Sequence, residues 1–312
     1  MKLAQSAAAV LLAAVISLQA GPGAIYAAGA KAGTSTAAAS TASTVKSHSN
    51  DVYNHMLSLL KSPAKQAEAV SYLEKNIRQA TPAQATTMLL KLENAEKANL
   101  DAWNNKFFKD SVQSKLMKLM KSGDDLTTLI RKTSDKSLKS LLTSARDSGY
   151  RLETSEGMFY LVLDYPRYQK VRSFVTADIQ SYIDIMTAET KNPFANDAAL
   201  SIGWTEVTKR ALAQEKFLKS FPKSNRAAQV KELYQQYLNV SLHGLNNTPL
   251  FDYDTKKIDP KAKSALAAAV SKGDPSKSGY LKTLKGFLDV LKKNNDTLTP
   301  DVEKYRKSVS GA

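Results

Sequence analysis

The starts of helices are marked clearly in this sequence, by a capping residue followed directly by proline. The side-chain oxygen of Ser, Thr or Asp accepts a hydrogen bond from an unpaired backbone N–H, and proline fits the first helical position because its missing donor has no partner there. Gln84 adds a reciprocal capping box to Thr81. Five such pairs predict helix starts: Ser62-Pro63, Thr81-Pro82, Asp259-Pro260, Asp274-Pro275 and Thr299-Pro300.

Between these starts the apolar residues recur three and four positions apart, which predicts amphipathic helices. Residues 196–220 are predicted as one long helix, and Ser224 is predicted to cap the next, which runs to about His243. The turns are short, so neighbouring helices should be antiparallel. The sequence predicts an all-α fold, an irregular array of antiparallel helical hairpins. Helix ends are expected at Gly123, Gly149, Gly244 and Gly273.

One segment departs from this pattern. In residues 158–165, MFYLVLDY, apolar side chains alternate with the period of a strand, and Pro166 disfavours helix at Tyr165. We expect an extended connector between two helical layers, with one set of side chains in the core; a short helix is the alternative. Core filling is the simpler interpretation, and the functional one is an acidic, aromatic wall of a ligand groove. Its candidate binding residues are Glu156, Tyr160, Asp164 and Tyr165.

The first 50 residues predict export. Lys2 precedes an apolar run from Ala7 to Leu18, and Ala28-Gly-Ala30 offers a cleavage site, with cleavage after Ala27 as the neighbouring possibility. The run is shorter than the roughly 20 residues of a spanning helix. Residues 1–30 are therefore predicted to be a signal peptide. Residues 31–50 are Ala, Ser, Thr and Gly with little apolar bulk, and we expect a flexible leader.

The remainder, residues 51–312, has no cysteine, so its stability must come from an apolar core rather than from disulfides. We expect an N-terminal helical portion at 51–149 and a C-terminal one at 150–312, packed as one unit. An exported chain of this kind without disulfides is typical of bacteria more than of eukaryotic secreted domains.

The net charge is +15, and it is unevenly distributed. Lys and Arg outnumber Asp and Glu by 16 to 11 in residues 51–150 and by 20 to 11 in residues 201–312, whereas residues 151–200 have 5 against 7. Outside a cell such a surface meets wall polymers, anionic headgroups and acidic polysaccharide before nucleic acid. We therefore expect an anionic cell-wall polymer or an envelope protein as partner, with peripheral membrane contact possible and no nucleic acid. Solvated helix faces are the simpler interpretation.

Part of the chain resembles known exported proteins. Residues 215–238, EKFLKSFPKSNRAAQVKELYQQYL, resemble a tetratricopeptide-like helical hairpin. Residues 156–254, through EGMFYLVLDY, DAALSIGW, EKFLKSFPKS and LHGLNNTPLFDYDT, resemble an uncharacterised group of exported helical proteins of Gram-positive spore-forming bacteria. The resemblance covers about a third of the chain. It implies export and helical packing, and it carries no activity.

Motifs for catalysis are mostly absent. The sequence has no cysteine nucleophile, no G-x-S-x-G elbow and no Gly-rich phosphate loop. Its three histidines, His48, His55 and His243, lie outside any zinc-binding spacing, so no metal or other cofactor is expected. Paired carboxylates of a glycan hydrolase are the enzymatic alternative. The candidates for that role are Glu153, Glu156, Asp164, Asp178 and Asp184.

Two further residues are candidates for binding. Asp252 lies in FDYDTKKIDP, which has carboxylates for calcium but lacks the turn glycine and the final Glu of an EF-hand, so an Asx turn is favoured. Trp204 lies at helical spacing with other aromatic residues, which favours core packing over a carbohydrate-stacking platform. We expect a secreted or cell-surface, non-enzymatic binding or scaffold protein; the alternatives are the hydrolase and a secreted membrane-active helical protein.

Overall fold

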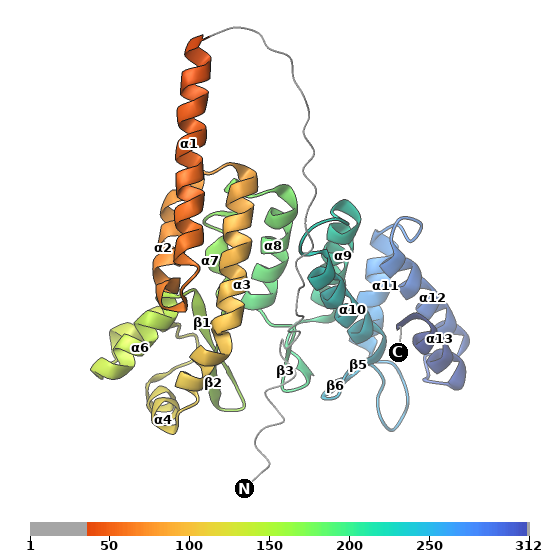
Figure 1. The fold of residues 1–312 in the computed structure, drawn as a ribbon. Helices are drawn as coiled ribbons and strands as arrows, with labels where there is room; N and C mark the ends of the chain where they lie inside the picture. Colours follow the sequence, from red (N-terminus) through yellow and green to blue (C-terminus); the bar gives the residue numbers. More distant parts are fainter. Residues whose placement is uncertain (1–35, 311–312) are drawn as a thin grey trace. The chain divides into compact units, whose positions relative to one another are not determined.

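The computed structural model describes residues 36–310, with side chains from 48 to 309. Within this range most residues are helical, and the strands form three short antiparallel pairs (Figure 1). The prediction of an all-α fold is confirmed. Residues Ser49–Ala312 form one compact unit, distinct from Met1–His48. The expected signal peptide and its cleavage site lie outside the described residues.

The first described helix, α1, spans Thr36–Leu59. Residues 36–50, which we expected to belong to a flexible leader, are therefore helical, and the helix begins upstream of Asp51. Val52, Met56 and Leu59 are buried on one face and anchor the second half of α1. Alanine is the strongest helix former, so an Ala-rich stretch extends a helix that this burial has already nucleated.

The next helices build the N-terminal portion. The capping box of Thr81 is present as predicted: Gln84 N donates to Thr81 Oγ1 over 3.3 Å, and Thr81 N donates to Gln84 Oε1 over 3.0 Å. Ser62 precedes only a short 3-10 turn, Pro63–Lys65, and makes no side-chain cap. The helices are α2 Gln66–Asn76, α3 Pro82–Phe107, α4 Asp110–Leu119, α5 Leu126–Lys132 and α6 Lys136–Asp147.

The extended segment is one half of a β-hairpin. β2, Met158–Leu163, pairs with β1, Tyr150–Ser155, through the two-residue turn Glu156-Gly157, where both residues have positive φ. The strand is confirmed, but the expected connector between two layers is wrong. The alternation of Tyr150 and Leu152 with polar residues was the overlooked signal for its partner.

Two side-chain amides complete the outer edge of β2. Asn104 of α3 bonds to both the N–H and the C=O of Leu161, at 2.7 and 3.2 Å. Gln113 of α4 does the same for Phe159, at 2.9 and 2.7 Å, and also donates to Phe107 O over 2.8 Å. Because buried backbone groups need partners, these amides take the place of a third strand and fix the hairpin against α3 and α4.

Two predicted helix boundaries are wrong in the middle of the chain. Tyr165 begins a short helix, α7, Tyr165–Tyr168, because Pro166 occupies an early helical position where no N–H is needed. The predicted helix 196–220 begins only at Trp204, because Asp197 and Ala198 adopt positive φ in a tight turn. The elements here are the 3-10 turn Arg172–Phe174, α8 Ala177–Lys191, β3 Ala195–Asn196, β4 Ala199–Leu200 and α9 Trp204–Ser220.

The C-terminal portion is a further series of helices. Asp259 caps α11 as predicted, accepting from Ala262 N over 2.6 Å, and α13 begins at Pro300 after Thr299. The helix predicted to begin at Pro275 after Asp274 is absent. The next helix, α12, begins at Gly279, and Ser278 is its cap. Ser224 does not cap α10, because the helix begins only at Ala227 with Arg226 at the N-cap position; the Ser224 hydroxyl donates to Asp178 over 2.6 Å and accepts from Arg226 N over 3.3 Å. The elements are α10 Ala227–His243, β5 Gly244–Leu245, β6 Thr248–Pro249, α11 Pro260–Lys272, α12 Gly279–Lys293 and α13 Pro300–Ser310.

Two apolar clusters hold these elements together. The first is built by α1–α8 and the β1–β2 hairpin, and the second by α9–α13. The α9–α10 hairpin belongs to both, because Phe217 and Val230 join the first cluster while Val207 and Tyr237 join the second. Burial of these side chains is the main source of stability in a chain without disulfides.

The close approach of α3 to the end of α6 gives a stability prediction. Gly149 has a φ of +91°, and a Cβ atom there would lie 2.1 Å from Glu96 Oε1. Gly149→Ala combines backbone strain with overpacking and is expected to lower the free energy of unfolding by about 3 kcal/mol. Gly157→Ala is the matched control: its φ is +77° but nothing lies within 4 Å, so only about 1 kcal/mol of strain is expected. If urea unfolding showed the same loss of unfolding free energy for both variants, the Glu96 side chain would not be fixed against Gly149.

Candidate functional site

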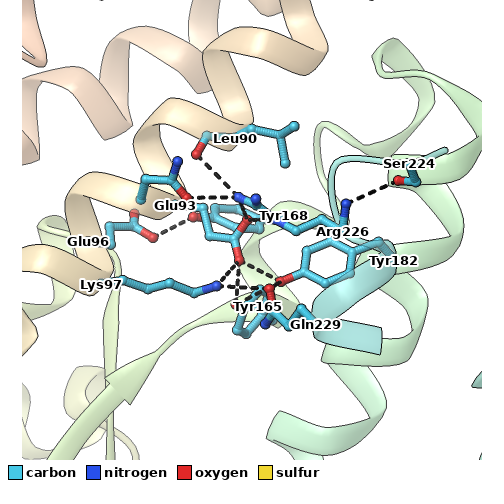
Figure 2. A network of polar contacts seen from close by, with 11 residues as sticks. Leu90, Glu93, Glu96, Lys97, Tyr165, Tyr168, Tyr182, Ser224, Arg226 and Gln229 are labelled. Carbon is cyan, nitrogen blue, oxygen red and sulfur yellow. Dashed lines mark hydrogen bonds and ion pairs between the residues drawn. The ribbon is translucent and has the colours of Figure 1, made fainter. Parts of the chain in front are cut away.

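The most concentrated set of polar side chains is a buried network between α3, α7, α8 and the start of α10 (Figure 2). α3 supplies Glu93, Glu96 and Lys97, which lie three and four positions apart and therefore on one side of the helix. Glu93 and Glu96 are 0% and 1% exposed. The other members are Tyr165, Tyr168, Tyr182, Arg226 and Gln229.

Glu93 is the ionised centre of this network. Arg226 contacts Glu93 Oε2 through Nη2 at 2.7 Å and through Nε at 3.0 Å, and Lys97 Nζ lies 2.7 Å from Glu93 Oε1. The hydroxyls of Tyr165 and Tyr182 donate to Glu93 Oε1 over 2.7 and 2.5 Å. Burial alone would raise the pKa of Glu93, but the charges of Lys97 and Arg226 and these hydrogen bonds outweigh it and lower the pKa.

Glu96 lies one turn along α3 and behaves oppositely. Burial raises its pKa well above the usual range; the hydrogen bond from Tyr168 opposes the rise, and the charge of Glu93 adds to it. Glu96 Oε1 has no hydrogen-bond partner and faces the backbone of Gly149. The direction of this shift favours the neutral form of Glu96, since an ionised carboxylate here would be an uncompensated buried charge.

Three tyrosines donate hydrogen bonds to the two glutamates and keep their own protons. Burial, followed by the charge of Glu93, raises the pKa of Tyr165 and Tyr182 well above the ordinary value. For Tyr168 burial is again the largest cause, followed by Glu96. The network continues through Tyr150, whose hydroxyl donates to Glu96 O over 2.7 Å and accepts from Gln66 over 2.9 Å.

Two carboxylic acids with opposed pKa shifts are the pattern of a general acid and base. Both are closed to solvent here, and two hollows in the described part of the chain lie elsewhere. One, of about 390 Å³, lies beside α11 and includes Lys257, Lys263 and Asp296; the other, of about 470 Å³, lies along α10 and includes Tyr234 and Val309. In this geometry the network ties four helices together through charge and hydrogen bonds.

The predicted binding segment divides between buried and exposed positions. Tyr165 is buried in the network, which contradicts the expectation that it faces a ligand. Tyr160 and Asp164 are half-buried, and burial raises the pKa of both. Glu156 is exposed at the turn of the β1–β2 hairpin. The structure therefore distributes these four residues between the core, the hairpin face and its tip.

The two remaining candidates are also separate from each other. Trp204 is buried in the second apolar cluster at the start of α9, as its helical spacing indicated. Asp252 is exposed, and its Oδ1 accepts from Asp254 N, Thr255 N and Thr255 Oγ1. These contacts form the predicted Asx turn and lower the pKa of Asp252, chiefly through the bonds from Thr255.

The carboxylates considered for a hydrolase have separate partners. Glu153 pairs with Arg151 at 2.9 Å, and Asp184 pairs with Arg172 at 2.6 Å. Asp178 accepts from Ser224 and from Thr176. Within residues 48–309 no group of three or more His, Asp and Glu side chains is placed to hold a metal ion.

Comparison with known proteins adds no relative: no protein-family model, no curated protein and no solved structure matches this chain. Assignment of function therefore depends on the molecule's own residues.

The pair Glu93 and Glu96 is not among the residues predicted from the sequence, although the sequence contains a signal for it. Ala85, Met88, Leu89 and Leu92 define the buried face of α3, and Glu96 follows Leu92 at the next helical step. A charged residue at a core position of an amphipathic helix predicts a buried polar partner. The partners themselves come from residues about 70 to 130 positions away, and one sequence does not identify them.

The two glutamates predict opposite mutational effects at neutral pH. Glu93→Gln removes the counter-charge of Arg226 and Lys97, and breaking a buried pair in this way is expected to lower the free energy of unfolding by about 3–5 kcal/mol. Glu96→Gln replaces a neutral acid with a neutral amide and is expected to leave stability at pH 7 unchanged or raised. Urea unfolding of both variants measures the difference; comparable losses would contradict an ionised Glu93 beside a neutral Glu96.

The same pair predicts how stability depends on pH. The folded-state pKa of Glu96 is raised, so its contribution is fully present below the unfolded pKa of about 4.3 and is lost as the pH rises toward the folded pKa. The folded-state pKa of Glu93 is lowered, so its contribution is present above about pH 4.3 and is lost as the pH falls through the folded value. Glu96→Gln should therefore remove part of the decline in stability as the pH rises above about 4.3. An unchanged slope would argue against a neutral Glu96.

Proposed function

We propose that this chain is an exported, non-enzymatic binding or scaffold protein of the bacterial cell surface, and that its basic helix faces hold an anionic wall polymer. The observation that carries the proposal is the placement of lysine. Among residues 48–309 no lysine side chain is buried, whereas Glu93, Glu96 and Glu215 are. The lysine charge is thus displayed to solvent, whereas two arginines, Arg210 and Arg306, and part of the negative charge are buried inside the fold.

The lysines of α11 and α12 illustrate this display. Lys261, Lys282, Lys292 and Lys293 are exposed, and no acidic side chain lies within ion-pairing distance of them. By contrast, Lys263 is held by Asp296 at 2.6 Å and Lys285 by Asp289 at 2.7 Å. A flexible polyanion needs this kind of surface, with many separate cations and no deep pocket, since its charges repeat along the polymer.

Export and surface location rest on the sequence. The apolar run Ala7–Leu18 followed by Ala28-Gly-Ala30 has the form of a signal peptide, and the chain has no cysteine. The resemblance to exported helical proteins of Gram-positive spore-formers supports the same location. A glycan hydrolase is the enzymatic rival, and release of soluble fragments from purified walls by the intact chain would favour it.

The proposal predicts retention of the purified chain on isolated cell walls that carry anionic polymer. Exposed charges are screened within about 8–10 Å at 0.1–0.15 M salt, so retention should fall steeply as NaCl rises. Replacing Lys261, Lys282, Lys292 and Lys293 with Gln should weaken retention. The matched control replaces the same four with Arg, which keeps the charge and should keep retention. The bound fraction after pelleting the walls is the measurement.

Walls stripped of their anionic polymer provide the second control. Retention should be lost on stripped walls. Salt-insensitive retention, or equal retention on intact and stripped walls, would contradict the proposal.

A further inference from the structure

The region around α4 exposes large apolar side chains. Phe108, Met117 and Met158 are 40%, 63% and 46% exposed, and among the described residues only two other large apolar side chains, Phe174 and Tyr253, are similarly open. Scattered exposed apolar residues are ordinary, but a group of them on one surface indicates contact with another apolar phase.

Gln113 joins the three backbone segments that carry these side chains. Its amide bonds to Phe107 O, next to Phe108, and to the N–H and C=O of Phe159, next to Met158. Met117 lies one turn further along α4 from Gln113. The end of α3, the helix α4 and the start of β2 are therefore joined around one buried side chain, and each of the three apolar residues lies within a few residues of Gln113 or of a residue that it binds.

The same surface is basic. Residues 106–139 contain nine Lys and Arg against four Asp. Lys106, Lys109, Lys118 and Lys121 are exposed and form no ion pair, although Lys106 Nζ lies 4.0 Å from the centroid of the Trp103 ring. Of the four acids, Asp124 pairs with Lys132, Asp135 pairs with Lys115, and Asp125 caps α5. Asp110, in the first turn of α4, is the acidic side chain within the basic surface.

We propose that this surface is a docking site for a membrane with anionic headgroups. The α4 face consists of Phe108, Met117 and Met158 together with Lys106, Lys109, Lys118 and Lys121. The three apolar side chains enter the boundary between headgroups and acyl chains, and the lysines contact the headgroups above them. A soluble polyanion would satisfy the lysines and leave Phe108 and Met117 in water, so the combination favours lipid over wall polymer.

The contact is peripheral. None of the helices within residues 36–310 is long and apolar enough to cross a membrane. α4 has 10 residues, and its buried side, Gln113 and Leu116, is already packed against the protein. The inference rests on the described residues alone, and it does not depend on wall binding.

Sedimentation with vesicles tests the docking site. The full chain is mixed with vesicles of phosphatidylcholine, with or without phosphatidylglycerol, and binding is expected only when the anionic lipid is present. Lys109→Gln with Lys118→Gln should reduce the partition coefficient roughly tenfold or more. Phe108→Ser with Met117→Ser should reduce it to a similar extent, because two apolar side chains no longer enter the interface.

Matched controls separate the α4 face from general charge and general apolarity. Lys216→Gln with Lys223→Gln removes the same charge from α9 and the turn after it, and Phe174→Ser with Tyr253→Ser removes two exposed rings elsewhere. Both controls should bind as the unchanged chain does. Every variant keeps the same N-terminal segment, so its apolar run contributes equally. Equal binding by the α4 variants and the controls would overturn the proposal. The proposal would also be overturned if the lysine variant of α4 lost binding while the Phe108→Ser, Met117→Ser variant kept it.

A fluorescence measurement reports insertion directly. The indole of Met117→Trp should shift its emission to shorter wavelength with phosphatidylglycerol vesicles and stay unshifted with isolated wall polymer. An unshifted indole on vesicles, or a shift with wall polymer as large as that with vesicles, would contradict docking on lipid. Wall retention of the α4 variants is measured in parallel, so failure of the membrane site and failure of the wall proposal give different results.

Discussion

The fold depends on the placement of one ionised carboxylate inside its core. Glu93 of α3 is closed to solvent. It is nevertheless ionised, because the positive charges of Arg226 and Lys97 balance its negative charge and two tyrosine hydroxyls complete its hydrogen bonding. Apolar burial is non-directional and is compatible with many packing arrangements. The buried ion pair of Glu93 with Arg226 requires one arrangement, in which the two side chains meet. It joins the first apolar cluster to the start of α10, and α10 with α9 belongs to both clusters.

The neutral Glu96 beside it shows how environment separates two identical residue types. Glu93 meets two cations, while Glu96 meets Tyr168, the Glu93 charge and a glycine backbone. The polar centre is thus stable with a single negative charge. Opposed acids of this kind serve catalysis when a substrate reaches them; here they are enclosed by the aromatic side chains that hold them.

Local signals predicted much of the fold and little of the site. The capping box at Thr81 and the cap at Asp259 are short-range chemistry, so sequence identified them correctly. The same reasoning failed at Asp274 and Ser224, whose side chains find other partners once the chain folds. Tyr165 was read as a groove residue because neither its burial nor its bond to Glu93, 72 positions away, is visible in the sequence. Contacts between residues far apart in the chain cannot be predicted from a single sequence.

The amides along the outer edge of β2 have a consequence for the protein at high local concentration. An open strand edge presents free N–H and C=O groups that another copy of the chain can pair with when many copies are close together. Asn104 and Gln113 occupy these groups on Leu161 and Phe159. The hairpin therefore offers no template for strand exchange or fibrous growth along this edge, and copies can accumulate side by side without fusing their sheets.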